Sequence, residues 1–265
     1  MPDNMLNRAL RVKFSVRLPL ANCPPPMLLY KLSSTFADAG VPLAMGDEKR
    51  PRPIVNLAYP LPLGVEGLEE WADATLETGS SESLDIVKEQ LRRCSPKGLY
   101  ILDIEQIPLH ASSIAELCET AYWSWFCPDK LFLDAVQKIE IFSNSDSFKI
   151  NKTSKVHGKK TMALVEVRHV IQELCWEDKT LRFSTKIIQG QALNPQKVIA
   201  SIMGIGLEQM GRLQRERIVI KHDPKLSRHD KYAIKLRNIY EDAVLLESGP
   251  GIKLCEDDEE GWLAL

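Results

Sequence analysis

The sequence predicts an α+β fold: two tandem ferredoxin-like units, each of the order β-α-β-β-α-β, followed by a charged C-terminal extension. Segments with alternating apolar residues and segments with apolar residues at helical spacing follow one another in this order, and the order recurs in the second half. A chain of 265 residues with 44% hydrophobic residues is long and apolar enough for two such units. The expected bounds are residues 8–108 and 116–221 for the units and 222–265 for the extension.

The first unit is expected to open with a strand over residues 10–18, because apolar and polar residues alternate strictly there. Three prolines then introduce a helix over residues 27–39, and Gly40 stands where a helix commonly ends. The later elements follow from the same two periodicities. They are strands at 54–58 and 71–77, a helix at 83–93 and a strand at 98–107.

The segment from Arg50 to Gly64 holds four prolines among apolar residues. It predicts a strand at 54–58 bracketed by two stiff Pro-x-Pro turns, because proline at a strand end costs no ladder hydrogen bond. A Pro-x-x-Pro docking peptide is the weaker alternative, since the residues between the turns are apolar and suited to burial.

The second unit is expected to repeat the order with an addition. Asn194 and Pro195 are a typical start for its second helix. An extra strand or hairpin is expected around residues 170–177. The remaining elements are strands at 119–126, 148–151, 162–168, 180–188 and 212–220, and helices at 129–142 and 194–203.

Composition excludes several classes of protein. The 34 basic and 36 acidic residues nearly cancel, so no overall field favours nucleic acid or membrane. No apolar run approaches the roughly 20 residues of a membrane span, and the first residues do not resemble a signal peptide. We therefore expect a cytoplasmic protein without membrane contact. The six cysteines are scattered without a Cys-x-x-Cys pair, so no metal, iron–sulfur cluster or other cofactor is expected.

The strongest local charge signal lies in residues 149–160, which hold five lysines and a histidine but no carboxylate. Lysines at this density attract phosphate backbones and release counterions. A flexible, solvated hairpin is the alternative. Arg215, with Arg212 and Arg217 beside it, would extend the patch if these residues share its side. The candidate RNA- or anion-binding residues here are Lys152, Lys155, His157, Lys159, Lys160 and Arg215.

The charges in the first unit favour a structural role over RNA binding. Arg11, Lys13 and Arg17 are expected on the open sheet face, with carboxylates of neighbouring strands opposite them. A sheet that reads RNA presents two or three aromatic residues, and only Trp71 is expected on this face. Charge pairing across strands is therefore the preferred interpretation.

No other motif indicates catalysis. Gly204 and Gly206 follow a helix and lack the third glycine of a dinucleotide fingerprint, and the lysine-rich loop lacks the glycines of a phosphate loop. Two histidines, His222 and His229, are separated by Pro224 and have no third ligand in view. We expect neither catalytic residues nor a metal site.

The end of the chain is strongly patterned in charge. Residues 212–237 carry nine basic and three acidic residues, and residues 241–260 carry one basic and eight acidic residues. A solvated appendage that folds back on itself is the preferred interpretation, and a partner-binding arm is the alternative.

Four short motifs together resemble the radical SAM-linked protein family, whose members are encoded beside, or fused to, cobalamin-binding radical SAM proteins. They are Arg11-Val-Lys-Phe14, Ala39-Gly-Val-Pro42, Leu61-Pro-Leu-Gly64 and Asp73-Ala-Thr-Leu-Glu77. The resemblance covers residues 8–110 well and continues more weakly to about 220. It implies a radical SAM protein as partner, and it relates residues 149–160 to a Lys/Arg-rich segment of the family.

The chain also departs from this family. The resemblance places Arg50 and Arg52 where the family has asparagine and histidine, and Leu20 to Pro26 where it has serine, histidine and aspartate. A polar site of the family is therefore lost here, or the two arginines replace it with an anion-binding one.

These observations favour a non-catalytic accessory protein that binds RNA or presents it to a partner radical SAM enzyme. The cysteines that would hold the cluster are absent from this sequence, so that chemistry would reside in the partner. One alternative is a protein–protein adaptor of the radical SAM partner without RNA binding. A third, less favoured, is a ferredoxin-like RNA-processing enzyme with His157 as general acid or base.

Overall fold

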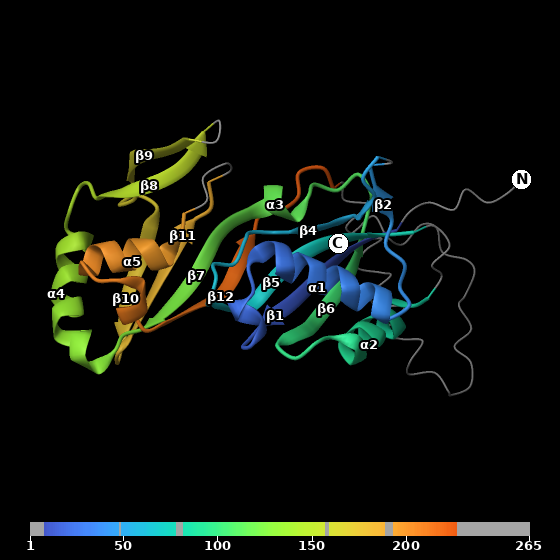
Figure 1. The fold of residues 1–265 in the computed structure, drawn as a ribbon, viewed down its shortest axis with the longest axis horizontal. Helices are drawn as coiled ribbons and strands as arrows, with labels where there is room; N and C mark the ends of the chain where they lie inside the picture. The colour runs from blue at the N-terminus through green and yellow to red at the C-terminus, as the bar shows by residue number, and fades with distance from the viewer. Residues whose placement is uncertain (1–7, 48, 78–81, 157–158, 189–192, 227–265) are drawn as a thin grey trace, which may run out of the picture.

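The computed structural model describes residues 8–47, 49–77, 82–156, 159–188 and 193–226. Its centre is one mixed α+β body built on an eight-stranded sheet of order β10-β11-β7-β12-β5-β1-β6, with β4 also paired to β5 (Figure 1). Helices α1 and α2 lie beside the first half of the sheet, and α4 and α5 lie beside the second half. In the described part of the chain, no helix is both long and apolar enough to cross a membrane.

The first half follows the expected order. Its strands pair antiparallel. Across the sheet they lie in the order β6, β1, β5, β4, which are the fourth, first, third and second of these strands in chain order. A short two-stranded ribbon of β2 (Met45–Gly46) and β3 (Arg52–Pro53) precedes β4. The main elements are β1 (Arg8–Val16), α1 (Pro25–Asp38), β4 (Val55–Leu57), β5 (Glu66–Leu76), α2 (Leu84–Cys94) and β6 (Leu99–Ile107).

The second half has the same spatial order, with strands β10, β11, β7 and β12 side by side. A short helix, α3 (Ile114–Leu117), precedes it. A reciprocal capping box of Ser113 and Glu116 caps the N-terminus of this helix. The remaining elements are β7 (Cys118–Phe126), α4 (Phe132–Ser143), β10 (Ile171–Glu177), β11 (Thr180–Lys186), α5 (Pro195–Met203) and β12 (Arg212–Ile220).

One expectation for this half is wrong. Strands were expected in the sheet around residues 148–151 and 162–168, with an addition at 170–177, and the structure has the reverse. β8 (Lys149–Val156) and β9 (Lys159–Glu166) form a separate hairpin, whereas β10 pairs with β11 in the main sheet. The physical reason is that β10 supplies apolar residues to the core, buried Ile171 and partly buried Leu174 and Trp176.

The helix signals of the sequence are confirmed where they were strongest. Asn194 caps α5 by accepting hydrogen bonds from the backbone N–H groups of Gln196 and Lys197. Gly204 ends that helix with a φ of 66°, and Gly40 follows α1 with a φ of 71°. The expected strand between the proline turns is also present as β4.

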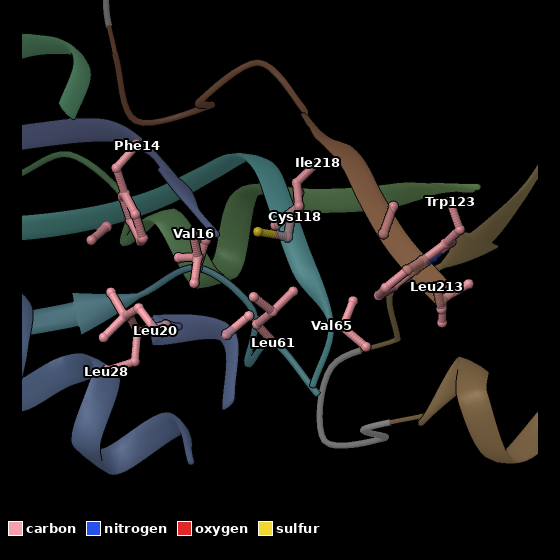
Figure 2. Packing of buried hydrophobic residues seen from close by; sticks show 14 of the residues in the cluster. Phe14, Val16, Leu20, Leu28, Leu61, Val65, Cys118, Trp123, Leu213 and Ile218 are labelled. Atoms are coloured by element: carbon pink, nitrogen blue, oxygen red, sulfur yellow. The ribbon is translucent and has the colours of Figure 1, made fainter. Parts of the chain in front are cut away.

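The two halves meet in one sheet and one core. β12 pairs with the start of β5 in parallel, with Gln214 opposite Glu66 and Arg215 opposite Gly67. Buried residues form a continuous cluster across this junction, from Phe14 and Leu28 in the first half to Trp123 and Leu213 in the second (Figure 2). The residues that bring the halves together are therefore core residues of both.

Candidate nucleic-acid interface

The base of the β8–β9 hairpin is fixed by one carboxylate. Glu166 accepts hydrogen bonds from the backbone N–H of Phe148 at 2.7 Å, the backbone N–H of Arg168 at 2.9 Å and the hydroxyl of Ser147. The Ser147 hydroxyl and these backbone donors lower the pKa of Glu166 to about 2. The carboxylate is therefore ionised at neutral pH and closes the hairpin at its root.

Arg168 ties the same root to the body of the protein. Its guanidinium donates to the backbone carbonyl oxygens of Ser143, Ser145 and Ile171, and it lies 5.2 Å from the centre of the Phe142 ring. Phe142 also makes an edge-to-face contact with Phe148, at a ring distance of 5.2 Å. The hairpin thus leaves the body from a well-packed base between α4 and β10.

Beyond this base, the hairpin stands apart from the sheet. Ile150 is buried and Val165 half-buried, but Lys149, Met162 and Leu164 are exposed. In Figure 1 the hairpin lies above α5, near the end of the molecule that carries α4. The hairpin is a two-stranded element outside the main sheet, and most of the side chains described near its base, in residues 149–151 and 162–166, are exposed.

The expected lysines lie on both arms of this hairpin. The backbone register pairs Lys155 with Lys160, Lys152 with Ala163, and Val156 with Lys159. His157 lies outside the described residues, so its expected place in the patch stays a prediction. The structure therefore brings the four candidate lysines onto one backbone element.

Arg50 and Arg52 are exposed, but they lie elsewhere. Arg52 belongs to β3, which pairs with β2, and Figure 1 shows β2 and the hairpin toward opposite ends of the molecule. Among the described residues, no carboxylate forms an ion pair with either arginine. The two arginines and the hairpin lysines are therefore separate features.

Arg215 does not contribute to a surface patch, because its side chain is fully buried. Its guanidinium forms a two-pronged ion pair with Glu70, with the Nε–oxygen distance at 2.8 Å. It also donates to the backbone oxygen of Tyr59 and lies between the rings of Tyr59 and Trp123. Burial raises the pKa of Glu70, and the facing guanidinium opposes that rise. This arginine is a structural link between the halves.

The other two arginines of β12 are exposed and lie over aromatic rings. Arg212 lies 5.1 Å from the centre of the Phe126 ring, and Arg217 lies 4.6 Å from the centre of the Tyr122 ring. Both are on the opposite face of the sheet from Arg215. Arg212 is there by ordinary strand alternation, and Arg217 is there because a bulge lies between Arg215 and Arg217. Sequence reasoning missed this arrangement because a bulge has no clear sequence signal.

The expected pairing of Arg11 with Asp73 is confirmed, but Arg11 is only 5% exposed and so does not lie on an open sheet face. Arg11 binds the Asp73 carboxylate at 2.8 Å, and the backbone oxygen of Ser112 accepts a further hydrogen bond from it. Lys13 is paired with Glu69 at 2.9 Å. Among the described residues, no group of three or more metal-ligating side chains is present.

The family described as "Uncharacterized protein conserved in bacteria" (DUF2344) matches residues 36–195, more than half of the chain. The chain belongs to this family. The DUF2344 match runs from the end of α1 to the start of α5, so it contains the whole β8–β9 hairpin. It also contains both exposed arginines of the proline-rich segment.

No curated protein matches this DUF2344 sequence. Two solved structures show a distant likeness. One is titled "Crystal Structure of a Cbf5-Nop10-Gar1 Complex", with 12% identity, a TM-score of 0.37, and coverage of 80% of this chain and 48% of that chain. The other is a putative glycine cleavage system transcriptional repressor, with 11% identity, a TM-score of 0.20, and coverage of 82% and 99%. The chain spans about half the length of the first.

Proposed function

We propose that this DUF2344 protein is a non-catalytic RNA-binding protein whose β8–β9 hairpin contacts the phosphate backbone. The observation that carries the proposal is the hairpin itself. It stands outside the eight-stranded sheet on a base fixed by Glu166 and Arg168, and five lysines without a carboxylate lie within residues 149–160. A projecting strand pair with this charge suits a groove or strand lined by phosphates.

The proposal extends to a partner. The resemblance to the radical SAM-linked family supports an accessory role, in which the protein presents RNA to a radical SAM enzyme that performs the chemistry. The repeated spatial order of strands in the two halves supports two ferredoxin-like units fused into one sheet. Joint purification of the protein with a radical SAM protein encoded beside it would test this part.

A protein–protein adaptor is the second candidate, and one observation favours it. Leu133 is 80% exposed and Ile141 is 71% exposed on α4. They lie two turns apart with the exposed Gln137 between them, so α4 presents two separate apolar side chains that a protein partner could cover.

Salt dependence of RNA binding tests the first candidate. Fluorescence anisotropy with a labelled single-stranded 20-nucleotide RNA would be measured between 50 and 200 mM salt. The triple variant Lys155→Ala, Lys159→Ala, Lys160→Ala is expected to bind more weakly. Its slope of log affinity against log salt should be shallower by about 2, since each lost phosphate contact removes about 0.7.

The matched control removes three positive charges from the first half, on α1, on α2 and in the turn after α2, as Lys31→Ala, Arg93→Ala, Lys97→Ala. This variant should keep the wild-type slope. If the wild-type protein shows no RNA affinity at 50 mM salt, RNA binding is wrong and the adaptor becomes the preferred function.

A further inference from the structure

Fusion of the two halves into one sheet creates a continuous face opposite the core, here called the outer face. On the inner side, Phe14, Trp123 and Leu213 are at most 2% exposed. Their strand neighbours point the other way, because successive side chains alternate across a strand. The outer face therefore collects side chains from β7, β12, β5 and β1, which come from both halves of the chain.

Three aromatic rings lie on this outer face, each with a cation over it. The pairs are Arg217 with Tyr122 at 4.6 Å, Arg212 with Phe126 at 5.1 Å, and Lys13 with Trp71 at 5.5 Å from the ring centres. In each pair the two residues are directly opposite one another on adjacent strands. The sequence prediction concerned the first unit, which supplies only Trp71 to this face.

The two pairs on β7 and β12 have a polar row between them. Ser124 lies opposite Gln214, so the strands carry aromatic, polar and aromatic positions in turn. Tyr122 and Phe126 are four residues apart, which is about 13 Å along a strand. A nucleic-acid strand that crosses this face would meet two separate stacking surfaces.

The outer face carries paired cations, available cations and the carboxylate of Glu216, which accepts a hydrogen bond from Ser124 and lies 3.6 Å from Arg182. Lys13 is paired with Glu69, and Arg212 is paired with Glu66. Arg217 is exposed and forms no ion pair among the described residues, and the same holds for Lys186 on β11, the strand on the other side of β7. Arg217 and Lys186 can therefore meet phosphates, while the paired cations stay over their rings.

A face of this kind suits unpaired bases. Bases of a single strand can stack on aromatic rings and on the plane of an arginine guanidinium, whereas bases inside a duplex are stacked on one another and out of reach. A guanidinium already lying over a ring adds cation–π attraction to such a stack.

We infer that the outer face around Tyr122, Phe126, Arg217 and Trp71 is a stacking platform for single-stranded RNA. This inference rests on the proposed RNA binding and adds which form of RNA the protein takes. The lysine hairpin supplies attraction to phosphates, which does not distinguish single strands from duplexes, and the platform supplies the preference for unpaired bases.

The test compares one labelled 20-nucleotide RNA as a single strand and annealed to its complement. The wild-type protein should bind the single strand at least tenfold more tightly. The variant Tyr122→Leu, Phe126→Leu keeps apolar side chains but removes both rings, so its affinity for the single strand should fall at least tenfold. Its affinity for the duplex should stay within a factor of two.

Two further variants separate stacking from loss of fold. Arg217→Gln changes an exposed side chain and should weaken single-strand binding by several-fold with an unchanged melting temperature. Tyr30→Leu is the control, because it removes a tyrosine that is 63% exposed on helix α1, away from the outer face. This control should bind both RNAs as the wild type does.

The outcomes keep the two proposals apart. Unchanged single-strand affinity in both the Tyr122/Phe126 and the Arg217 variants would overturn the platform, even if the hairpin lysine variant loses RNA binding as expected. Equal affinity of the wild type for single strand and duplex would also overturn it. Absence of any RNA binding by the wild type would instead refute the proposed function.

Discussion

Arg215 connects the two halves of the protein through a single guanidinium. It neutralises the buried Glu70 and holds the backbone oxygen of Tyr59 in the proline-rich segment. Its ring contacts, to Tyr59 and Trp123, come from one residue of each half. A buried ion pair adds little net stability, but removal of one partner leaves a buried charge without compensation.

We therefore predict that Arg215→Met destabilises the protein by about 3–5 kcal/mol. Urea unfolding followed by tryptophan fluorescence would measure the free energy of unfolding. The double variant Arg215→Met, Glu70→Leu should recover most of the loss, because no unpaired charge remains. Arg93→Met on the exposed face of α2 is the control and should change the value by less than about 0.5 kcal/mol. A double variant as unstable as the single one would contradict this account.

Alternation alone would have placed Arg215 and Arg217 on one face. The bulge between them puts the first into the core and the second over Tyr122 on the outer face. The pairing of Arg11 with Asp73, by contrast, was predictable because β1 and β5 are long and regular enough for their register to be inferred. Residue-level prediction succeeded where strands are regular and failed at irregularities.

At the scale of elements, the base of the β8–β9 hairpin depends on the carboxylate of Glu166. Glu166 has a folded-state pKa of about 2, below its ordinary value of 4.5. Its contribution to the hairpin base is therefore fully present above pH 4.5 and is lost as the pH falls toward 2. The base of the β8–β9 hairpin should therefore stay intact at neutral pH.

Glu166→Gln should loosen the hairpin base at neutral pH, because the neutral amide accepts hydrogen bonds more weakly than the carboxylate. We predict faster hydrogen exchange at the backbone N–H of Phe148 and unchanged exchange in β7. Glu140→Gln on the exposed side of α4 is the control. Equal protection of Phe148 in wild type and Glu166→Gln would show that packing alone holds the base.

Helices and main strands were largely predictable because capping residues and alternation act locally, as at Asn194 and in β1. The roles of β8–β9 and β10 were exchanged, since the choice of sheet partner depends on which apolar face reaches the core. Local periodicity identifies a strand, but it does not identify its neighbour.

At the scale of the whole molecule, the halves share one sheet and one buried cluster. We predict a single cooperative unfolding transition in urea rather than two. Circular dichroism reports both halves, whereas tryptophan fluorescence of a Trp71→Phe variant loses its only described reporter in the first half. The two curves should coincide, and separate midpoints would show that the halves are independent domains.

The outer face could not be inferred from the sequence, because it exists only where β12 meets β5. Trp71 belongs to the first half, and Tyr122 and Phe126 belong to the second. The first half offers one ring, and no local pattern indicates that it shares a surface with the two rings of the second half. The candidate lysines were found because charge density is visible in a short window of sequence.

The pairing of Glu70 with Arg215 also constrains the order in which the protein can be completed during synthesis. The two residues are 145 positions apart, and the arginine lies on the last strand of the sheet. While the chain is still emerging from the ribosome, the first half lacks the guanidinium that compensates the Glu70 carboxylate when it is buried. We therefore expect the start of β5 to gain this neighbour only after β12 has been made.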